Sequence, residues 1–224
     1  SMVLRMIRMS ELRDPKETGP HVNSVSSYAV EIYDRWAFNN SIDENESKKF
    51  RDTLKIASML HDVGKVAISD LILKKPSRFT PEEYLIMQGH TWLGAKLFNE
   101  IESAVDRVAR EVALTHHENW DGTGYPGRVS VENGAIEVAD PATGRAKGLE
   151  GEEIPIAGRI VALADVYDAL SCKRVDKEPW AEDKVLDEIR NLRGTKFDPA
   201  VVDAFFEILP SIQAIRERFP DVEE

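Results

Sequence analysis

Two adjacent histidines, His116 and His117, lie between an apolar, helix-like segment and a loop rich in glycine, aspartate and proline. Neutral imidazole is the commonest side-chain ligand for transition metals in proteins. Adjacent histidines at the end of a helix can point into one cavity once the loop leaves helical geometry. The stretch HHENWDGTGYP at residues 116–126 therefore predicts a metal site.

The remaining histidines support this interpretation, because none is left over for the surface. The chain has only 5 histidines. The other three, His21, His61 and His90, each lie in a segment that can face the pair. An isolated histidine such as His90, at the start of an apolar face, would more often be a packing residue, so its assignment as a ligand rests on the whole set.

Acidic residues near the histidines extend the candidate ligand set. Asp62 directly follows a histidine, and its carboxylate could bridge two ions. Asp165 lies on a strongly apolar helix, where a carboxylate is costly unless it is paired or bound to metal. Glu17 precedes His21 by four positions. The intervening Gly19-Pro20 makes a shared helical face insecure, although both side chains could still converge on one ion.

Three cations accompany these ligands. Lys65 follows the histidine and aspartate at 61 and 62 and offers a positive charge to a phosphate oxygen; the alternative is a solvated surface lysine. Arg174 and Lys177 follow the apolar helix that carries Asp165. Positive charge at a helix C-terminus also favours the helix dipole, so by themselves these two would be read as helix-end charges.

The candidate residues fall on or beside segments with helical periodicity. Thr80, Pro81 and Glu83 have the pattern of an N-cap, a first-turn proline and a capping box. Asp198-Pro199 begins another helix in a similar way. The predicted helices cover residues 2–12, about 20–36, 50–60, 80 towards 90, 90 to about 98, 104–115, 155–170, 181–193 and 198 onward. We therefore predict an all-α helical bundle.

One segment departs from the helical pattern. Alternating valine and isoleucine residues flank Asn133-Gly134, which is the strongest short hairpin signal. We predict a small β-hairpin insertion around residues 128–147. Its role stays open between a tolerated loop insertion and a lid beside the site.

Composition favours one compact domain. With 224 residues, 42% of them hydrophobic, the chain can bury a sizeable core, and we expect a single domain over residues 1–224. No apolar run approaches the length that crosses a bilayer and no signal peptide opens the chain, so the expected location is cytoplasmic. Ser1-Met2 is expected to be a cloning remnant.

Charge and cysteine content exclude other classes. The net charge of -11, from 40 acidic and 29 basic residues, disfavours binding to DNA or RNA. A phosphate substrate stays compatible, because bound cations can invert the local field. The single cysteine, Cys172, excludes an internal disulfide and fits a reducing compartment. Its apolar helical setting favours a packing role over a nucleophile.

The assembled motifs resemble those of the HD-GYP family, a branch of the HD-domain metal-dependent phosphohydrolases. The resemblance covers about residues 11–208, and its most specific part is the stretch at 116–126. The residues that carry it are Glu17-Thr18-Gly19-x-His21, His61-Asp62-x-Gly64-Lys65, His90, His116-His117-Glu118-x-x-Asp121-Gly122-x-Gly124-Tyr125-Pro126, Asp165-x-x-Asp168-Ala169-Leu170, Arg174 and Lys177.

The resemblance implies an HD fold with two or three divalent metal ions. Iron or manganese is expected first, although nickel and zinc also accept imidazole and carboxylate ligands. A glutamate at the position of Glu17 accompanies a third ion in the family. By analogy Asp62 bridges two ions, one of them completed by His21, His61 and Asp165 and the other by His90, His116 and His117.

The resemblance also implies hydrolysis of the bacterial second messenger cyclic di-GMP to linear pGpG and onward to GMP. Paired ions suit this reaction, because they bind both the attacking and the leaving oxygen and lower the pKa of a bridging water. Asp62 and Lys65 are the predicted catalytic residues, with Lys65 at the scissile phosphate. Arg174 and Lys177 would hold phosphate oxygens. Family members usually carry a sensory or receiver domain, so the chain is expected to be an excised catalytic domain.

Two alternatives remain at this stage. The same chemistry could act on hybrid cyclic GMP-AMP, because base-reading residues are not part of the recognised motifs. In the other alternative the chain is a signalling module without turnover that binds a cyclic dinucleotide, or a diguanylate cyclase through the Gly-Tyr-Pro loop at residues 124–126. The sequence leaves the oligomeric state open, a dimer included.

Overall fold

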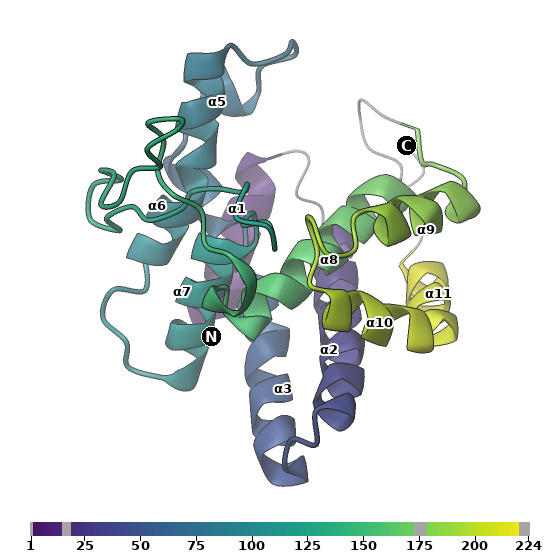
Figure 1. Cartoon of the computed structure of the whole chain (residues 1–224). Helices are drawn as coiled ribbons and strands as arrows, with labels where there is room; N and C mark the ends of the chain where they lie inside the picture. Colours follow the sequence, from purple (N-terminus) through teal and green to yellow (C-terminus); the bar gives the residue numbers. More distant parts are fainter. Residues whose placement is uncertain (1, 15–18, 173–177, 220–224) are drawn as a thin grey trace.

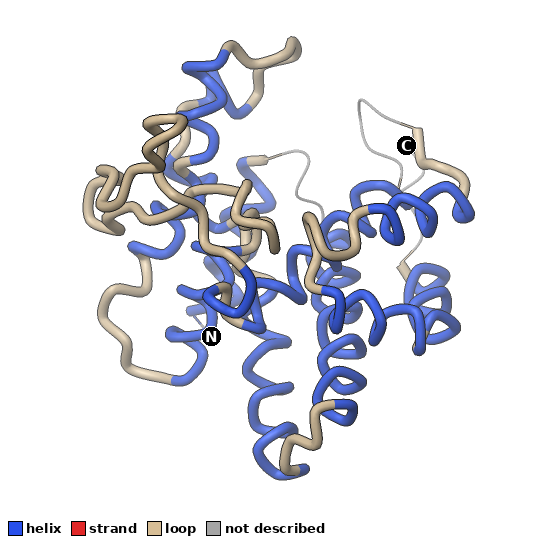
Figure 2. Tube along the Cα trace, viewed as in Figure 1, coloured by secondary structure: helices blue, strands red, loops and turns tan. Residues whose placement is uncertain are grey.

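A computed structural model describes residues 2–14, 19–172 and 178–219 of the chain. Over these ranges the regular structure is helical, and Figure 2 shows helices joined by loops. The elements are α1 (Met2–Arg13), α2 (Gly19–Asn39), α3 (Glu44–Ser58), the 3-10 helix η1 (Val63–Ala67), α4 (Asp70–Leu73), α5 (Pro81–Gln88), α6 (His90–Lys96), α7 (Ala104–Thr115), the 3-10 helix η2 (Gly151–Glu153), α8 (Ile156–Ser171), α9 (Glu182–Asn191), α10 (Pro199–Glu207) and α11 (Leu209–Arg218).

Helices α2 and α8 form the centre of the core. The long helix α2 packs against α3, α8, α10 and α11, and α8 crosses the middle of the molecule in Figure 1. Buried side chains lie on every side of α8, among them Ile160, Leu163 and Tyr167. A helix that is apolar all round belongs in the interior, so α8 holds its few polar residues among core side chains.

Helix starts follow the capping rules closely. The Thr80 hydroxyl accepts a hydrogen bond from the backbone N–H of Glu83, whose carboxylate accepts one from the N–H of Thr80. This capping box and the N-cap of Asp198 confirm the predicted starts of α5 and α10. The helix predicted over 50–60 begins earlier, at Glu44, because Asp43 caps its first turn and accepts hydrogen bonds from two backbone N–H groups.

The predicted β-hairpin at residues 128–147 is wrong. The Asn133-Gly134 turn does form, and Ser130 N–H donates to the Ala135 carbonyl. However, the pairing stops at single bridges, Val129 with Ile136 and Ala139 with Ala146. Ile136 remains 52% exposed, so the segment has no buried face to stabilise a longer ladder.

The 128–147 segment is nevertheless docked on α6, the helix that begins at His90. Lys96 Nζ donates to the Glu132 carbonyl at 2.6 Å, and Asn99 Nδ2 donates to the Glu132 carboxylate at 2.5 Å. A Cβ placed on Gly134 would lie 2.6 Å from the Trp92 ring, so the turn rests directly on that ring. These contacts fasten the segment to the bundle rather than leaving it as a free lid.

Within the described ranges, no helix combines the length and the apolar character that crossing a membrane requires.

Candidate metal centre

The structure brings seven of the predicted ligand residues into two neighbouring groups. Within each group, candidate ligand atoms lie within 4.8 Å of one another. Histidines and aspartates far apart in the sequence meet here, because α2, α6, α8, the turn between α3 and η1, and the end of α7 come together at one place. The first group is Asp62, His90, His116 and His117, and the second is His21, His61 and Asp165.

Asp62 belongs to the first group and also approaches the second group with its other carboxylate oxygen. Its Oδ1 is 3.1 Å from His90 Nε2 and 3.4 Å from His116 Nε2. Its Oδ2 is 3.5 Å from His61 Nε2. Asp165 Oδ1 lies 3.8 Å from that same His61 nitrogen, so Asp62 and the second group approach each other at His61.

A glycine allows this approach. A Cβ on Gly64 would lie 1.8 Å from the His90 carbonyl oxygen, so no residue with a side chain fits between η1 and α6. Gly64 follows Asp62 by two positions and is itself buried. The close contact of these two segments therefore sets the distance between Asp62 and His90.

Local hydrogen bonds orient three of the imidazole rings. The Nδ1 atoms of His61, His90 and His116 lie 2.8, 2.7 and 2.9 Å from the backbone carbonyls of residues 58, 87 and 112, respectively. A carbonyl can only accept, so Nδ1 carries the proton in each ring. The neutral ring then aims the lone pair of Nε2 into the centre.

The inner atoms of the site are suited to a cation. Among the described residues, Nε2 of His61, His90 and His116 and Oδ1 of Asp62 are buried without a hydrogen-bond donor. Acceptors this close together are unfavourable unless a positive charge lies between them. The donor set of imidazole nitrogens and carboxylate oxygens fits divalent transition metals, so the cluster could hold metal ions.

The protonation states agree with this use. Although burial alone would raise it, Lys65 and His61 hold the pKa of Asp62 well below its ordinary value. Burial lowers the pKa of His116. Burial, with His116 and His90 nearby, holds the pKa of His117 well below its ordinary value. A charged carboxylate and neutral imidazoles are the forms that bind metal.

Asp168 positions His21. Its Oδ2 lies 2.5 Å from His21 Nδ1, and its Oδ1 accepts a hydrogen bond of 2.5 Å from the Ser24 hydroxyl. Asp168 is only 1% exposed, which is unusual for a carboxylate. An aspartate that holds the outer nitrogen of a histidine fixes the ring and leaves the inner nitrogen directed at the site.

His117 is held from its other face by the Gly-Tyr-Pro loop. The ring of Tyr125 stacks on His117 with centroids 4.8 Å apart and an angle of 17° between the planes. The N–H of Tyr125 also donates to the His117 carbonyl at 3.1 Å. Tyr125 is partly buried, so the loop serves first to pack against a candidate ligand.

Lys65 lies at the edge of the first group. Its Nζ is 2.7 Å from Asp62 Oδ2 and 3.1 Å from Asp14 Oδ2. Asp14 is 2% exposed at the end of α1. Spacing in the sequence alone could not have paired Asp14 with Lys65.

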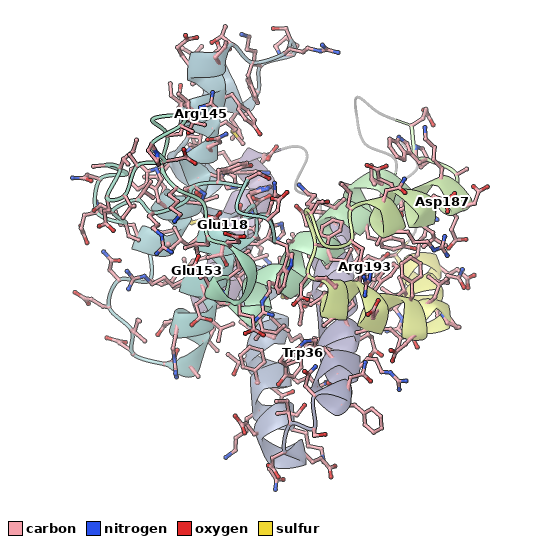
Figure 3. The ribbon with its side chains drawn as sticks, viewed as in Figure 1. Trp36, Glu118, Arg145, Glu153, Asp187 and Arg193 are labelled. Carbon is pink, nitrogen blue, oxygen red and sulfur yellow. The ribbon has the colours of Figure 1, made fainter. Side chains whose placement is uncertain are left out.

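Glu118 ties the loops around the site together (Figure 3). Its two carboxylate oxygens accept hydrogen bonds from the backbone N–H groups of Gly127, at 2.6 Å, and Leu149, at 3.2 Å. Burial raises the pKa of Glu118 to about 7. In the sequence analysis Glu118 was included in the motif but given no role. Its position directly after two candidate ligands was the one indication in the sequence that it lies beside the site.

Three of the predicted site residues lie outside the described residues: Glu17, Arg174 and Lys177.

A family model described as HD domain matches residues 18–170, and a second model of the same description matches residues 142–201. The chain belongs to the HD-domain family. This finding confirms the all-α fold and the family resemblance stated from sequence.

Several known proteins are similar to the chain. It is 40% identical to a 3'3'-cGAMP-specific phosphodiesterase of Vibrio cholerae, over 92% of this chain and 34% of the relative. It is 36% identical to a cyclic di-GMP phosphodiesterase of Thermotoga maritima, over 98% of this chain and 52% of the relative. The chain thus spans about a third to a half of these relatives.

The fold is similar to a solved structure. The crystal structure of a cyclic GMP-AMP-specific phosphodiesterase of Vibrio cholerae aligns with a TM-score of 0.59 at 16% identity, over 97% of this chain and 52% of the other. At this identity the likeness concerns the fold alone.

Proposed function

We propose that the chain is a metal-dependent phosphodiesterase that hydrolyses cyclic di-GMP to linear pGpG and onward to GMP. The observation that carries this proposal is the position of Asp62, whose Oδ1 faces two histidines while its Oδ2 faces a third. That placement suits a carboxylate shared by two ions. Cyclic di-GMP phosphodiesterases similar to nearly the whole chain support the substrate class.

The two groups would hold one ion each, with Asp62 between them, and we propose iron or manganese. When bound, such ions supply Lewis-acid activation of the phosphodiester and a nucleophile at neutral pH. The residues of the chain do the rest: buried histidines fix the positions of the ligand atoms, and Asp168 and Tyr125 keep two of the rings in place. Glu17 is proposed as a ligand of a third ion.

Lys65 is proposed to contact the scissile phosphate. Its ammonium lies beside Asp62, at the border of the centre, and could reach a phosphate oxygen bound there. A fixed cation there stabilises the extra negative charge of the transition state. Arg174 and Lys177 are proposed to hold other phosphate oxygens of the substrate.

Hybrid cyclic GMP-AMP is the second candidate substrate. The similarity that favours it is specific, since a 3'3'-cGAMP-specific phosphodiesterase is 40% identical over 92% of the chain. The metal centre does not discriminate between the two nucleotides, because both present the same phosphodiester. Selectivity between the two nucleotides must therefore come from residues that contact the bases.

The first test combines metal content with hydrolysis on protein purified without oxygen. We expect two or three metals per chain and turnover of cyclic di-GMP in the wild type. Asp62→Asn should lose both metal and turnover, whereas Asp70→Asn, which changes an exposed aspartate on α4, should keep both. Metal-loaded wild type that leaves cyclic di-GMP intact would sink the proposal.

Two further comparisons refine the result. Loss of one metal in Glu17→Ala would support a third ion, and unchanged content would give Glu17 a structural role. Competition between cyclic di-GMP and cyclic GMP-AMP at equal concentration separates the two substrates. Binding of nucleotide or of a diguanylate cyclase without turnover of either would favour the signalling module instead.

A further inference from the structure

Helix α5 stands apart from the core and carries an exposed aromatic residue. None of the residues in α5 is buried, and the helix contacts only its neighbours α4 and α6 closely. In Figure 1 it rises at the top of the view, above the main bundle. Tyr84, in its first turn, is 47% exposed. Neither core packing nor the metal ligands account for a large aromatic ring at this place.

Ring contacts connect Tyr84 to the metal centre. The Tyr84 ring meets the Tyr125 ring at a centroid distance of 6.1 Å and an angle of 74°, an edge-to-face arrangement. Tyr125 in turn stacks on His117. Tyr84 is therefore the outer member of a row of three aromatic rings whose inner member belongs to the first ligand group.

The position of Tyr84 is fixed rather than accidental. The capping box of Thr80 and Glu83 sets the start of α5, and Tyr84 N–H donates to the Thr80 carbonyl at 2.9 Å. Lys75 adds an ion pair with Glu83 at 2.5 Å. These contacts fix the backbone that carries the Tyr84 ring, so this segment loses little conformational entropy when a ligand stacks on the ring.

We propose that Tyr84 is a base-contacting residue that stacks on one purine of the cyclic dinucleotide bound at the centre, an inference that rests on the proposed function. A purine is joined through its ribose to the phosphate, so a phosphate at the histidines directs the base outward along the ring row. Aromatic side chains are the usual platforms for unpaired bases, because every base has a π face. The exposed ring of Tyr84 offers that platform.

The test uses the metal-loaded protein and a cyclic dinucleotide that carries 2-aminopurine, whose fluorescence is quenched by stacking. Removal of a stacking ring weakens nucleotide binding by about 5- to 160-fold in comparable sites. We expect Tyr84→Ala to raise Kd for the analogue, and KM for cyclic di-GMP, within that range. Tyr84→Phe should restore binding, since the ring is kept. Leu85→Ala, the matched control, removes a neighbouring exposed side chain that is not a ring and should change neither value.

Metal content separates this role from a structural one. Tyr84→Ala should keep the wild-type metal content and kcat, because the ring acts on the base and not on His117. Loss of metal from Tyr84→Ala would show that Tyr84 only supports the ligand His117. A change in Kd below about twofold would show that the exposed ring serves another surface. Either result overturns the proposal.

The wild type separates this proposal from the phosphodiesterase proposal. If the wild type binds the analogue but does not hydrolyse cyclic di-GMP, the phosphodiesterase proposal fails, while the comparison of Kd values still decides the role of Tyr84. A wild type that does not bind the analogue overturns the stacking proposal.

Discussion

Asp62 Oδ1 lies 3.1 Å from His90 Nε2. Since the Nδ1 of His90 is bonded to the Met87 carbonyl, the neutral ring offers a lone pair to a carboxylate oxygen. Two acceptors at this distance repel each other unless a proton or a metal ion lies between them. In the metal-free protein a proton can occupy this position instead of a metal ion. Metal ions and protons therefore compete for these two atoms.

This competition predicts how metal affinity depends on pH. The lowered pKa values of His116 and His117 keep these rings neutral below the usual histidine pKa of about 6.5. Affinity should therefore stay nearly constant as the pH falls from about 8 to about 6.5, and should decrease only at lower pH, where the rings protonate. Calorimetric titration in two buffers of different ionisation enthalpy counts the released protons. Release of about half a proton per histidine at about pH 6.5, the amount that an unshifted pKa would give, would contradict the lowered values.

Asp168→Asn should weaken metal binding by the second group. The change removes the charge that holds His21 Nδ1 and leaves the ring less firmly oriented. Loss of such an outer partner typically lowers metal affinity about 10- to 100-fold. Chelator titration measures the effect. Asp187, labelled in Figure 3, forms an exposed ion pair with Arg190, and Asp187→Asn should titrate like the wild type. Equal metal affinities of the two variants would show that Asp168 does not position His21.

Gly134→Ala should loosen the 128–147 segment. Gly134 has a φ of 73°, and an added Cβ would lie 2.6 Å from the Trp92 ring. Gly144→Ala is a matched control, because Gly144 has a φ of 69° but no atom within 4 Å of the added Cβ. Backbone strain of about 1 kcal/mol should affect both variants, and the clash should add about 1–3 kcal/mol only at Gly134. Urea unfolding and amide exchange of residues 128–147 provide the comparison, and equal losses would show that the ring contact is unimportant.

Glu118 should make stability depend on pH. Its pKa is about 7 in the folded protein and 4.5 as an isolated side chain, so the folded state binds the proton more tightly. The contribution to stability is complete below about pH 4.5 and is lost as pH rises through about 7, a change of up to about 3 kcal/mol. Glu118→Gln should remove this slope. The difference between wild-type and variant free energies of unfolding at several pH values tests it, and parallel curves would be the contrary result.

The candidate metal ligands could be predicted from the sequence because histidine is rare in this chain. All five histidines enter the two candidate groups, and their identity alone indicated a shared site. The capping box at Thr80 and the N-cap at Asp198 were also predictable, since these patterns depend on a few adjacent residues. Local rules that involve one helix end therefore transfer well from sequence to structure.

Features that depend on distant packing were not predictable. The alternating residues near Asn133-Gly134 indicated a hairpin, but strand length depends on a partner face that this segment does not have. The pairing of Asp14 with Lys65 joins two segments with no shared pattern. The row of rings from His117 to Tyr84 arises only when α5 and the Gly-Tyr-Pro loop meet in space.

The hydrogen bonds from His61, His90 and His116 to backbone carbonyls three or four positions earlier show that the centre is assembled in two distinct steps. Each ring is turned the right way by residues only three or four positions earlier, which a short helical segment can do alone. Bringing the rings together instead requires contacts between segments far apart in the chain. A folding chain can therefore carry correctly aimed but separate ligands, so that metal added during refolding would be captured late and would report completion of the whole bundle.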